Sequence, residues 1–138
     1  MITAIDTNIL LDIVAPNREF VEASIGVLEE AARSGSLVIC DIVYAELSVA
    51  FPTQRACDAF LEQNEIRVES LSHAASFLAS RLWRNYRRRG GKRNRILPDF
   101  LIGAHARLQA TRLLSRDRGF YRDMFPPLVV VDPAAPRT

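Results

Sequence analysis

Short apolar runs alternate with longer amphipathic stretches along the chain, and this alternation constrains the fold more than any other feature of the sequence. Runs such as Ile2–Ile5 and Leu37–Cys40 are typical of buried strands, whereas Phe20–Arg33, which lies between them, carries apolar residues at helical spacing. Strands that alternate with helices indicate βα units and a parallel sheet. The sequence therefore predicts an α/β fold.

Local start and stop signals place the remaining elements. Ser72 can cap a long helix, Gly90-Gly91 can end it, and Pro98 suits the first turn of the next helix. Besides the segments already named, we expect an edge strand at Ile66–Val68, a strand at Arg112–Leu114, a buried strand at Leu128–Val131, and helices at Thr7–Val14, about Val43–Phe51, Arg55–Gln63, Ser72 to about Arg89 and Asp99 to about Ala110.

Length and composition suit one globular unit, so we expect residues 1–138 to form a single domain. The chain is 49% hydrophobic and 25% charged, which is typical of a folded protein rather than a disordered one. No apolar run is long enough to cross a bilayer, and the N-terminus lacks a signal-peptide pattern, so we expect a cytoplasmic protein with no membrane partner. Cys40 and Cys57 lack metal-site spacing and are expected to be buried free thiols.

Charge is distributed unevenly along the chain. Residues 81–95 hold 8 of the 18 basic residues and no acidic residue, whereas the rest of the chain has 10 basic and 16 acidic residues, a net charge of −6. A basic segment on an acidic body favours a polyanionic partner that binds beside an acidic site.

Four acidic residues follow predicted strands or begin the helices after them. Asp6 and Asp117 come after the first and fourth strands, Glu46 lies early in the helix after the second strand, and Asp99 lies next to Pro98. Because the carboxyl ends of parallel strands meet at one crevice, these four carboxylates are expected to converge although they are far apart in sequence.

Such a cluster needs a counter-charge, because like charges repel in a partly dry site. An all-oxygen ligand set fits Mg²⁺ or Mn²⁺ better than zinc, and such an ion can activate water and neutralise charge on a phosphodiester. Each aspartate also has a structural alternative as a helix cap, a helix-dipole residue or a turn residue. Glu46 has apolar neighbours, among which an unpaired carboxylate would be costly, so it favours the site interpretation.

Four segments together resemble the motifs of PIN-domain nucleases. They are residues 5–12 (IDTNILLD), 41–47 (DIVYAEL), 98–106 (PDFLIGAHA) and 114–120 (LSRDRGF), the last followed by 129–133 (VVVDP). Their order and spacing match over almost the whole chain, and the closing segment is most similar to that of VapC-type toxins. The resemblance implies a PIN-like three-layer sandwich, in which helices flank a central five-stranded parallel sheet of strand order 3-2-1-4-5.

The resemblance also implies a metal-dependent endoribonuclease that leaves a 5′-phosphate and a 3′-hydroxyl. Asp6, Glu46, Asp99 and Asp117 would be the catalytic acids. Asp6, Asp99 and Asp117 would be metal ligands, Asp6 and Asp117 holding the better-occupied ion while Glu46 and Asp99 complete the pocket or a second site. Hydrogen bonds that orient these carboxylates would come from three further residues, Thr7, Asn8 and Ser115. Many relatives carry another acid where this chain has Gly119, so a second metal would be weak or assisted by the substrate.

The basic segment is the expected RNA-binding surface. Arg81, Arg84 and Arg88 fall on one helical face and have no acidic neighbours in the segment, although a charge run can also be a merely solvated face. Trp83 could stack on a base or pack against the core. The RNA-contacting residues we predict are Arg84, Arg87, Arg88, Arg89, Lys92 and Arg93.

For partners, the resemblance implies an RNA substrate, a homodimer and a cognate VapB-type antitoxin whose tail covers the acidic cleft. Two alternatives stay open: an RNA-processing PIN nuclease without an antitoxin, and a PIN-like module that binds RNA or protein without catalysis. A haloacid dehalogenase-type phosphatase is excluded because it needs an acid at position 8, which is Asn8. A receiver domain needs adjacent early acids and a late lysine, and the only lysine is Lys92.

Overall fold

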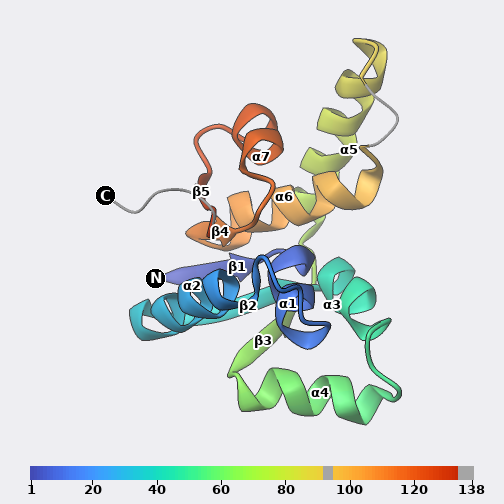
Figure 1. The fold of residues 1–138 in the computed structure, drawn as a ribbon. Helices are drawn as coiled ribbons and strands as arrows, with labels where there is room; N and C mark the ends of the chain where they lie inside the picture. Colours follow the sequence, from blue (N-terminus) through green and yellow to red (C-terminus); the bar gives the residue numbers. More distant parts are fainter. Residues whose placement is uncertain (92–94, 134–138) are drawn as a thin grey trace.

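The computed structural model describes residues 1–91 and 95–133 and contains one five-stranded sheet in which every pairing is parallel (Figure 1). The strand order, β3-β2-β1-β4-β5, is the predicted one. The strands are β1 (Ile2–Ile5), β2 (Ser36–Cys40), β3 (Ile66–Glu69), β4 (Arg112–Leu114) and β5 (Val129–Val131).

The three inner strands are buried, and the two edge strands are not. In β1, Ala4 lies opposite Val38 of β2 on one side and Leu113 of β4 on the other, and all three side chains are buried. The prediction of a buried fifth strand is wrong: β5 pairs with β4 alone, and Val129 is 58% exposed. A run of valines suits an edge strand as well as a central one, so the sequence pattern did not distinguish them.

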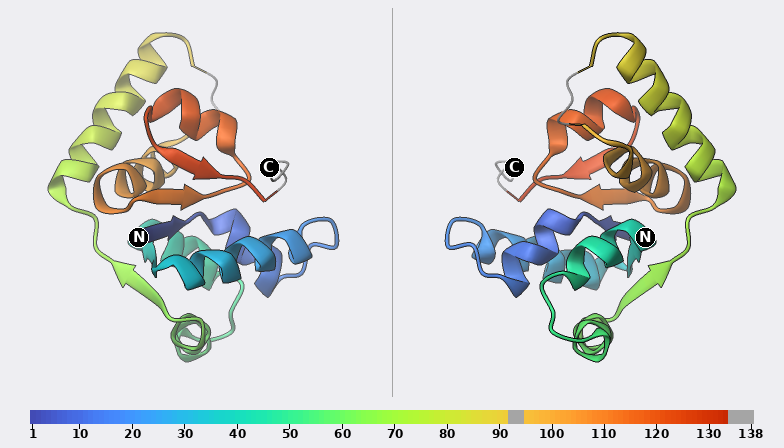
Figure 2. Two further views of the ribbon diagram at one scale, coloured as in Figure 1. Left: turned by 90° about the vertical axis from the view of Figure 1, so that its left-hand side faces the viewer. Right: turned by 90° about the vertical axis from the view of Figure 1, so that its right-hand side faces the viewer.

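Helices connect all the strands (Figures 1 and 2). The helices that connect β1 to β2 and β2 to β3 come before β3 in the chain, and those that connect β3 to β4 and β4 to β5 come after it. Because crossover connections between parallel strands are right-handed, the reversal after β3 places α1–α4 on one face of the sheet and α5–α7 on the other. The helices are α1 (Thr7–Val14), α2 (Val21–Ser34), α3 (Asp41–Ser48), α4 (Gln54–Gln63), α5 (His73–Arg88), α6 (Leu97–Gln109) and α7 (Arg118–Met124).

Most helix ends lie where the start and stop signals predict them. The Ser72 hydroxyl accepts a hydrogen bond from the Ala75 N–H (3.0 Å) at the start of α5, and Gly90 follows its end with a φ of 73°, which favours glycine. Pro98 is the second residue of α6. The helix α3 begins at Asp41, two residues before the expected start, because Cys40 already has the extended backbone of an N-cap.

Helix α7 was not predicted, although it completes one wall of the core. Its Tyr121 is buried, and Phe120 packs edge-on against Phe100 of α6 with ring centroids 5.2 Å apart. Gly103 of α6 makes room for Phe125, because a Cβ there would lie 2.2 Å from the Phe125 ring. The loop signals around Gly119 obscured an apolar pattern at helical spacing.

His105 is a polar residue inside the fold that pairs with a carboxylate. His105 is 1% exposed and its Nε2 lies 3.0 Å from a Glu69 carboxylate oxygen at the end of β3. Both cysteines are buried and free. Within the described residues, no helix combines the length and the apolar composition needed to cross a membrane.

The sheet topology fixes where a site can form. The chain leaves β1 toward β2 on one side and returns from β3 to β4 on the other, so β1 lies at the switch point of the strand order. A crevice opens at the carboxyl ends of the strands at such a point. Asp6 directly follows β1, and Ser115 directly follows β4.

Candidate active site

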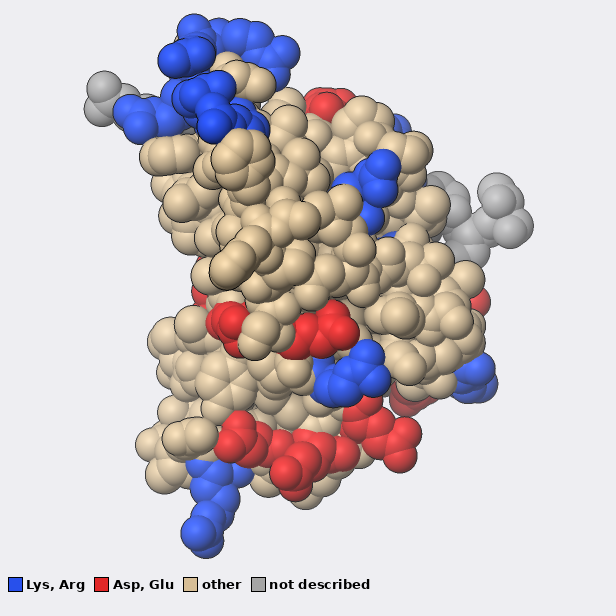
Figure 3. All heavy atoms as spheres, turned by 180° about the vertical axis from the view of Figure 1, so that it is seen from behind, with Lys and Arg blue, Asp and Glu red and all other residues tan. Residues whose placement is uncertain are grey.

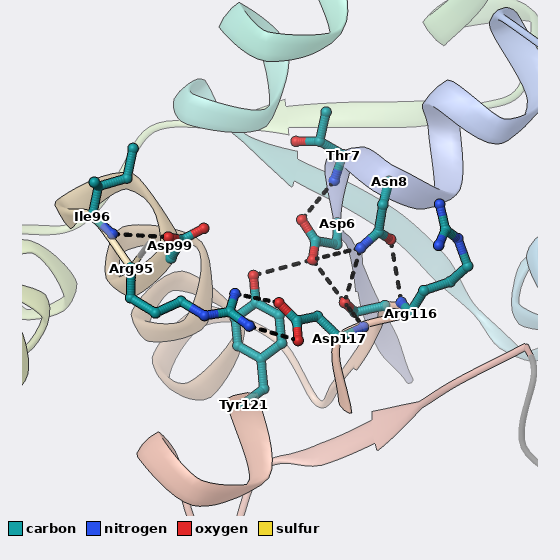
Figure 4. Close-up of polar contacts among 10 residues, drawn as sticks. Asp6, Thr7, Asn8, Arg95, Ile96, Asp99, Arg116, Asp117 and Tyr121 are labelled. Atoms are coloured by element: carbon teal, nitrogen blue, oxygen red, sulfur yellow. Dashed lines mark hydrogen bonds and ion pairs between the residues drawn. The ribbon is translucent and has the colours of Figure 1, made fainter. Parts of the chain in front are cut away.

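The Asp6 carboxylate directly follows β1 at the switch point of the sheet and is only 6% exposed. It accepts hydrogen bonds from the Thr7 N–H (2.7 Å), the Ser115 hydroxyl (2.7 Å) and the Tyr121 hydroxyl (3.1 Å), as Figure 4 shows in part. The Asn8 amide lies 3.5 Å from the same carboxylate. Donors from α1, from the end of β4 and from α7 therefore hold one buried acid.

Burial changes the acidity of this group. It raises the pKa of Asp6 from 3.8 to about 6, because desolvation disfavours the carboxylate more than its hydrogen bonds favour it. The nearby negative charge of Glu46 makes a smaller contribution to the raised pKa of Asp6. The site thus stores an unfavourable charge, which a cation would relieve.

Glu46 is linked to Asp6 through Thr7, whose hydroxyl donates to a Glu46 carboxylate oxygen at 2.6 Å. The argument that Glu46 sits on an apolar stripe is wrong, because the buried side of α3 carries Val43 and Leu47, and Glu46 is exposed at the rim. Its connection to the site rests on the Thr7 contact instead.

Asp117 lies on the other side of Asp6, and Ser115 connects the two. The Ser115 hydroxyl donates to Asp6 and accepts the Asp117 N–H at 2.9 Å, so one side chain positions both acids. The Asp117 carboxylate makes a two-pronged ion pair with Arg95, one prong being Nη2 to Oδ1 at 3.0 Å (Figure 4).

Asp99 lies in the first turn of α6, where its carboxylate accepts the Ile96 N–H at 3.0 Å. The structural alternative for Asp99, a helix-start residue, is therefore present in the geometry. The charge of Asp99 nevertheless contributes to raising the pKa of both Arg95 and Tyr121, the side chains that bind Asp117 and Asp6.

The charges of three of the candidate acids act on the hydroxyl of one residue, Tyr121. Burial raises the pKa of its hydroxyl well above the usual value, and the charges of Asp6, Asp99 and Asp117 raise it further. Sequence reasoning missed Tyr121 because it missed α7, and the aromatic spacing of residues 120, 121 and 125 was the signal that could have found it.

A second polar cluster, centred on Asp12 and Arg116, connects α1 to the segment that carries Asp117. Asp12, in the second half of α1, is only 3% exposed. It pairs with Arg116 through two hydrogen bonds of 2.8 and 3.0 Å and accepts the Ser24 hydroxyl. The Arg116 N–H donates to the Asn8 side chain, so the segment between Ser115 and Asp117 is fastened to α1.

The predicted RNA-binding arginines lie elsewhere on the surface. Figure 3 shows arginines gathered at the end of the molecule where α5 ends, and Asp and Glu mostly nearer the middle and the opposite end. Arg84, Arg87, Arg88 and Arg89 are exposed there, and the charge of Arg81 lowers the pKa of Arg84, as expected for neighbours on one face. Lys92 and Arg93 lie outside the described residues.

The acids fit a divalent cation by ligand type, because all four are oxygen donors. In the arrangement described, no three of the described histidine, cysteine and acidic side chains are close enough to hold a metal ion together. Asp117 is instead turned to Arg95 and Asp99 to the Ile96 N–H. The Arg95 guanidinium, which binds Asp117, shows that the site accommodates positive charge.

Fold and site together define an α/β protein with an acidic crevice at the switch point of its sheet. The chain belongs to the PIN domain family, whose model matches residues 3–123. Comparison with curated proteins found no match.

Several solved structures share the fold. The structure of VapBC2 from Rickettsia felis bound to a promoter DNA fragment has a chain that is 22% identical, with a TM-score of 0.73 over 96% of this chain and 98% of that one. VapBC-1 from nontypeable Haemophilus influenzae is 21% identical, with a TM-score of 0.72 over 98% and 100%. A toxin–antitoxin complex from Klebsiella pneumoniae is 20% identical, with a TM-score of 0.65 over 97% and 99%. At these identities the likeness establishes the fold.

The raised pKa of Asp6 predicts a pH-dependent penalty. Between about pH 4 and 6 the folded protein binds more protons at Asp6 than the unfolded chain does, so this residue lowers stability as pH rises through that window. In chelator, Asp6→Asn should therefore gain stability relative to wild type by on the order of 2 kcal/mol between pH 4 and pH 7.5.

Urea denaturation at the two pH values measures this difference. The exposed Asp123→Asn is the matched control and should show no such gain. A stability difference between Asp6→Asn and wild type that is the same at both pH values would contradict the burial argument.

Proposed function

We propose that this protein is a Mg²⁺- or Mn²⁺-dependent endoribonuclease that leaves a 5′-phosphate and a 3′-hydroxyl. The observation that carries the proposal is the arrangement around Asp6: Glu46 is tied to it through Thr7, Asp117 through Ser115, and Asp99 acts on the same Tyr121 hydroxyl. Membership of the PIN domain family supports a nuclease.

Each residue has a defined task in this proposal. Asp6, Asp99 and Asp117 would hold the metal, which supplies an activated water and neutralises charge on the phosphodiester. Glu46 completes the acidic pocket at its rim. Thr7 and Ser115 fix the carboxylates by the hydrogen bonds described above, and Asn8, whose contact with Asp6 is longer, takes part in the same network.

Asp99 would have to turn from the Ile96 N–H, or share one oxygen with it, to join Asp6 and Asp117. A carboxylate has two oxygens, and Ile96 uses only Oδ2. The helix start and a metal ligand are therefore compatible roles for the same side chain.

Removing the Asp99 charge tests the proposal. Wild type should cleave RNA with Mg²⁺ or Mn²⁺ and stop when the ion is chelated. Asp99→Asn should cleave roughly 100-fold more slowly or worse, because loss of hydrogen bonds that merely support ligands already costs about 10–100-fold. The asparagine oxygen can still accept the Ile96 N–H, so the metal-free variant should melt close to wild type.

Asp123→Asn is again the control and should cleave like wild type. A destabilised but fully active Asp99→Asn would assign Asp99 to the helix start alone. RNA binding without metal-dependent cleavage by the wild type would favour the non-catalytic module.

The arginines at the end of α5 form the proposed RNA-binding surface. Replacing Arg84, Arg87 and Arg88 by glutamine should weaken RNA binding and flatten its salt dependence, by roughly 0.7 in the log–log slope for each lost phosphate contact. Turnover of bound RNA should change less than affinity. Binding titrations at several salt concentrations measure the slope.

A matched triple variant controls for net charge. Arg18, Arg33 and Arg55 are exposed on other elements, and replacing them by glutamine removes the same charge. The slope should fall in the α5 variant and change little in the control; equal slopes in both would mean that the α5 surface makes no specific contact with RNA.

We further propose that the nuclease is the toxin of a type II toxin–antitoxin pair, acting as a homodimer with a VapB-type antitoxin. The support is the set of structural neighbours, which are toxin–antitoxin complexes and match nearly the full length of both chains. Expression of the wild type alone should arrest growth of its host, and Asp6→Ala should relieve the arrest. Harmless expression of soluble, active enzyme would instead identify an RNA-processing nuclease.

A further inference from the structure

Arg95 places a cation in the candidate site, which otherwise consists of acidic and neutral polar side chains. Both of its terminal nitrogens bind the Asp117 carboxylate, and its guanidinium lies over the Phe120 ring at 4.3 Å from the centroid. The side chain is 26% exposed, so it lies near the surface beside Asp117 rather than inside the core. Figure 4 shows it reaching across to Asp117 from the segment that precedes α6.

The surroundings of Arg95 are those of a cation site. Asp117 and Asp99 both act on it electrostatically, and the face of an aromatic ring attracts a guanidinium. The other arginine close to the site, Arg116, is bound twice to Asp12 and stacks on Phe20 at 4.0 Å. Among these two, Arg95 alone is attached to a predicted metal ligand.

An Asp117 carboxylate that is engaged on both oxygens by a guanidinium cannot serve a divalent ion equally well, because the two cations repel at such short range. Arg95 must therefore leave Asp117 if Asp117 becomes a ligand. The contact with the Phe120 ring can hold the guanidinium near the site after it leaves Asp117. The planar guanidinium can bind two oxygens of a phosphate as well as two oxygens of a carboxylate.

We propose that Arg95 is a further catalytic residue, which neutralises Asp117 in the metal-free protein and binds the phosphate of the RNA when Asp117 is a metal ligand. This inference rests on the proposed nuclease function. It predicts an unusual combination of effects, since removing Arg95 frees a metal ligand and at the same time removes a substrate contact.

Two measurements on the same proteins test the exchange. Calorimetric titration of the metal-free protein with Mn²⁺ should give about 3- to 10-fold tighter binding for Arg95→Gln than for wild type, the size expected for loss of a partly exposed ion pair. Cleavage at saturating Mn²⁺ should fall roughly 10- to 100-fold in kcat/KM, as for a lost hydrogen bond to a charged group. A lost metal ligand would instead weaken both.

Two further variants sharpen the test. Arg95→Lys keeps the charge but not the fork, so it should bind Mn²⁺ nearly as wild type does and recover part of the cleavage. Arg122→Gln removes an exposed arginine of α7 and should change neither quantity.

Unchanged Mn²⁺ affinity in Arg95→Gln would overturn the competition for Asp117. Tighter Mn²⁺ binding with undiminished cleavage would overturn the phosphate contact. If wild type binds Mn²⁺ but cleaves no RNA, the proposed function fails, whereas the Mn²⁺ titration of Arg95→Gln still decides whether Arg95 and a divalent ion exclude each other.

Discussion

The site depends first on the burial of one carboxylate at the end of the central strand. A charged Asp6 out of contact with water is costly unless hydrogen bonds surround it, and the fold supplies them from α1, from the end of β4 and from α7. These three elements are thereby held at fixed positions around the carboxylate. Because Ser115 donates to Asp6 and accepts from the backbone of Asp117, the second acid is placed by the same requirement.

A second constraint keeps that arrangement rigid. The part-buried ion pair between Asp12 and Arg116 fastens the segment after β4 to α1, while Arg116 also packs on Phe20. The backbone that carries Asp117 therefore has little freedom. The Asp117 side chain remains 34% exposed and can exchange partners, as the proposed role of metal ligand would require.

The sequence predicted the strand order, and it placed Asp6 and Asp117 directly after strands and Asp99 beside a helix-starting proline, where the structure has them; the roles of these acids in a site stay predictions. Parallel-sheet geometry places Asp6 and Asp117 at neighbouring strand ends, but no three of the described acidic side chains lie close enough together to hold a metal ion. The ion pairs of Asp12 with Arg116 and of Asp117 with Arg95 join residues 104 and 22 positions apart, and no local pattern encodes them. The sequence analysis missed Tyr121 because it missed α7, whose turn-forming residues obscured a short apolar pattern. Glu46 was predicted to belong to the site because its neighbours are apolar, but its side chain is exposed. Its hydrogen bond with Thr7 still links it to the site.

Charge distribution explains why an arginine at the crevice matters for a site of this kind. Outside residues 81–95 the chain is acidic, and Figure 3 shows the basic surface concentrated where α5 ends. Because salt screens exposed charges over about 8 Å at physiological ionic strength, the arginines at the end of α5 would attract the chain of phosphates more than they would neutralise a phosphate at the acidic site. Local positive charge has to come from the site itself. Arg95 belongs to the basic segment by sequence and to the acidic crevice by its contact with Asp117, and it therefore connects the surface that would bind RNA to the residues that would cleave it.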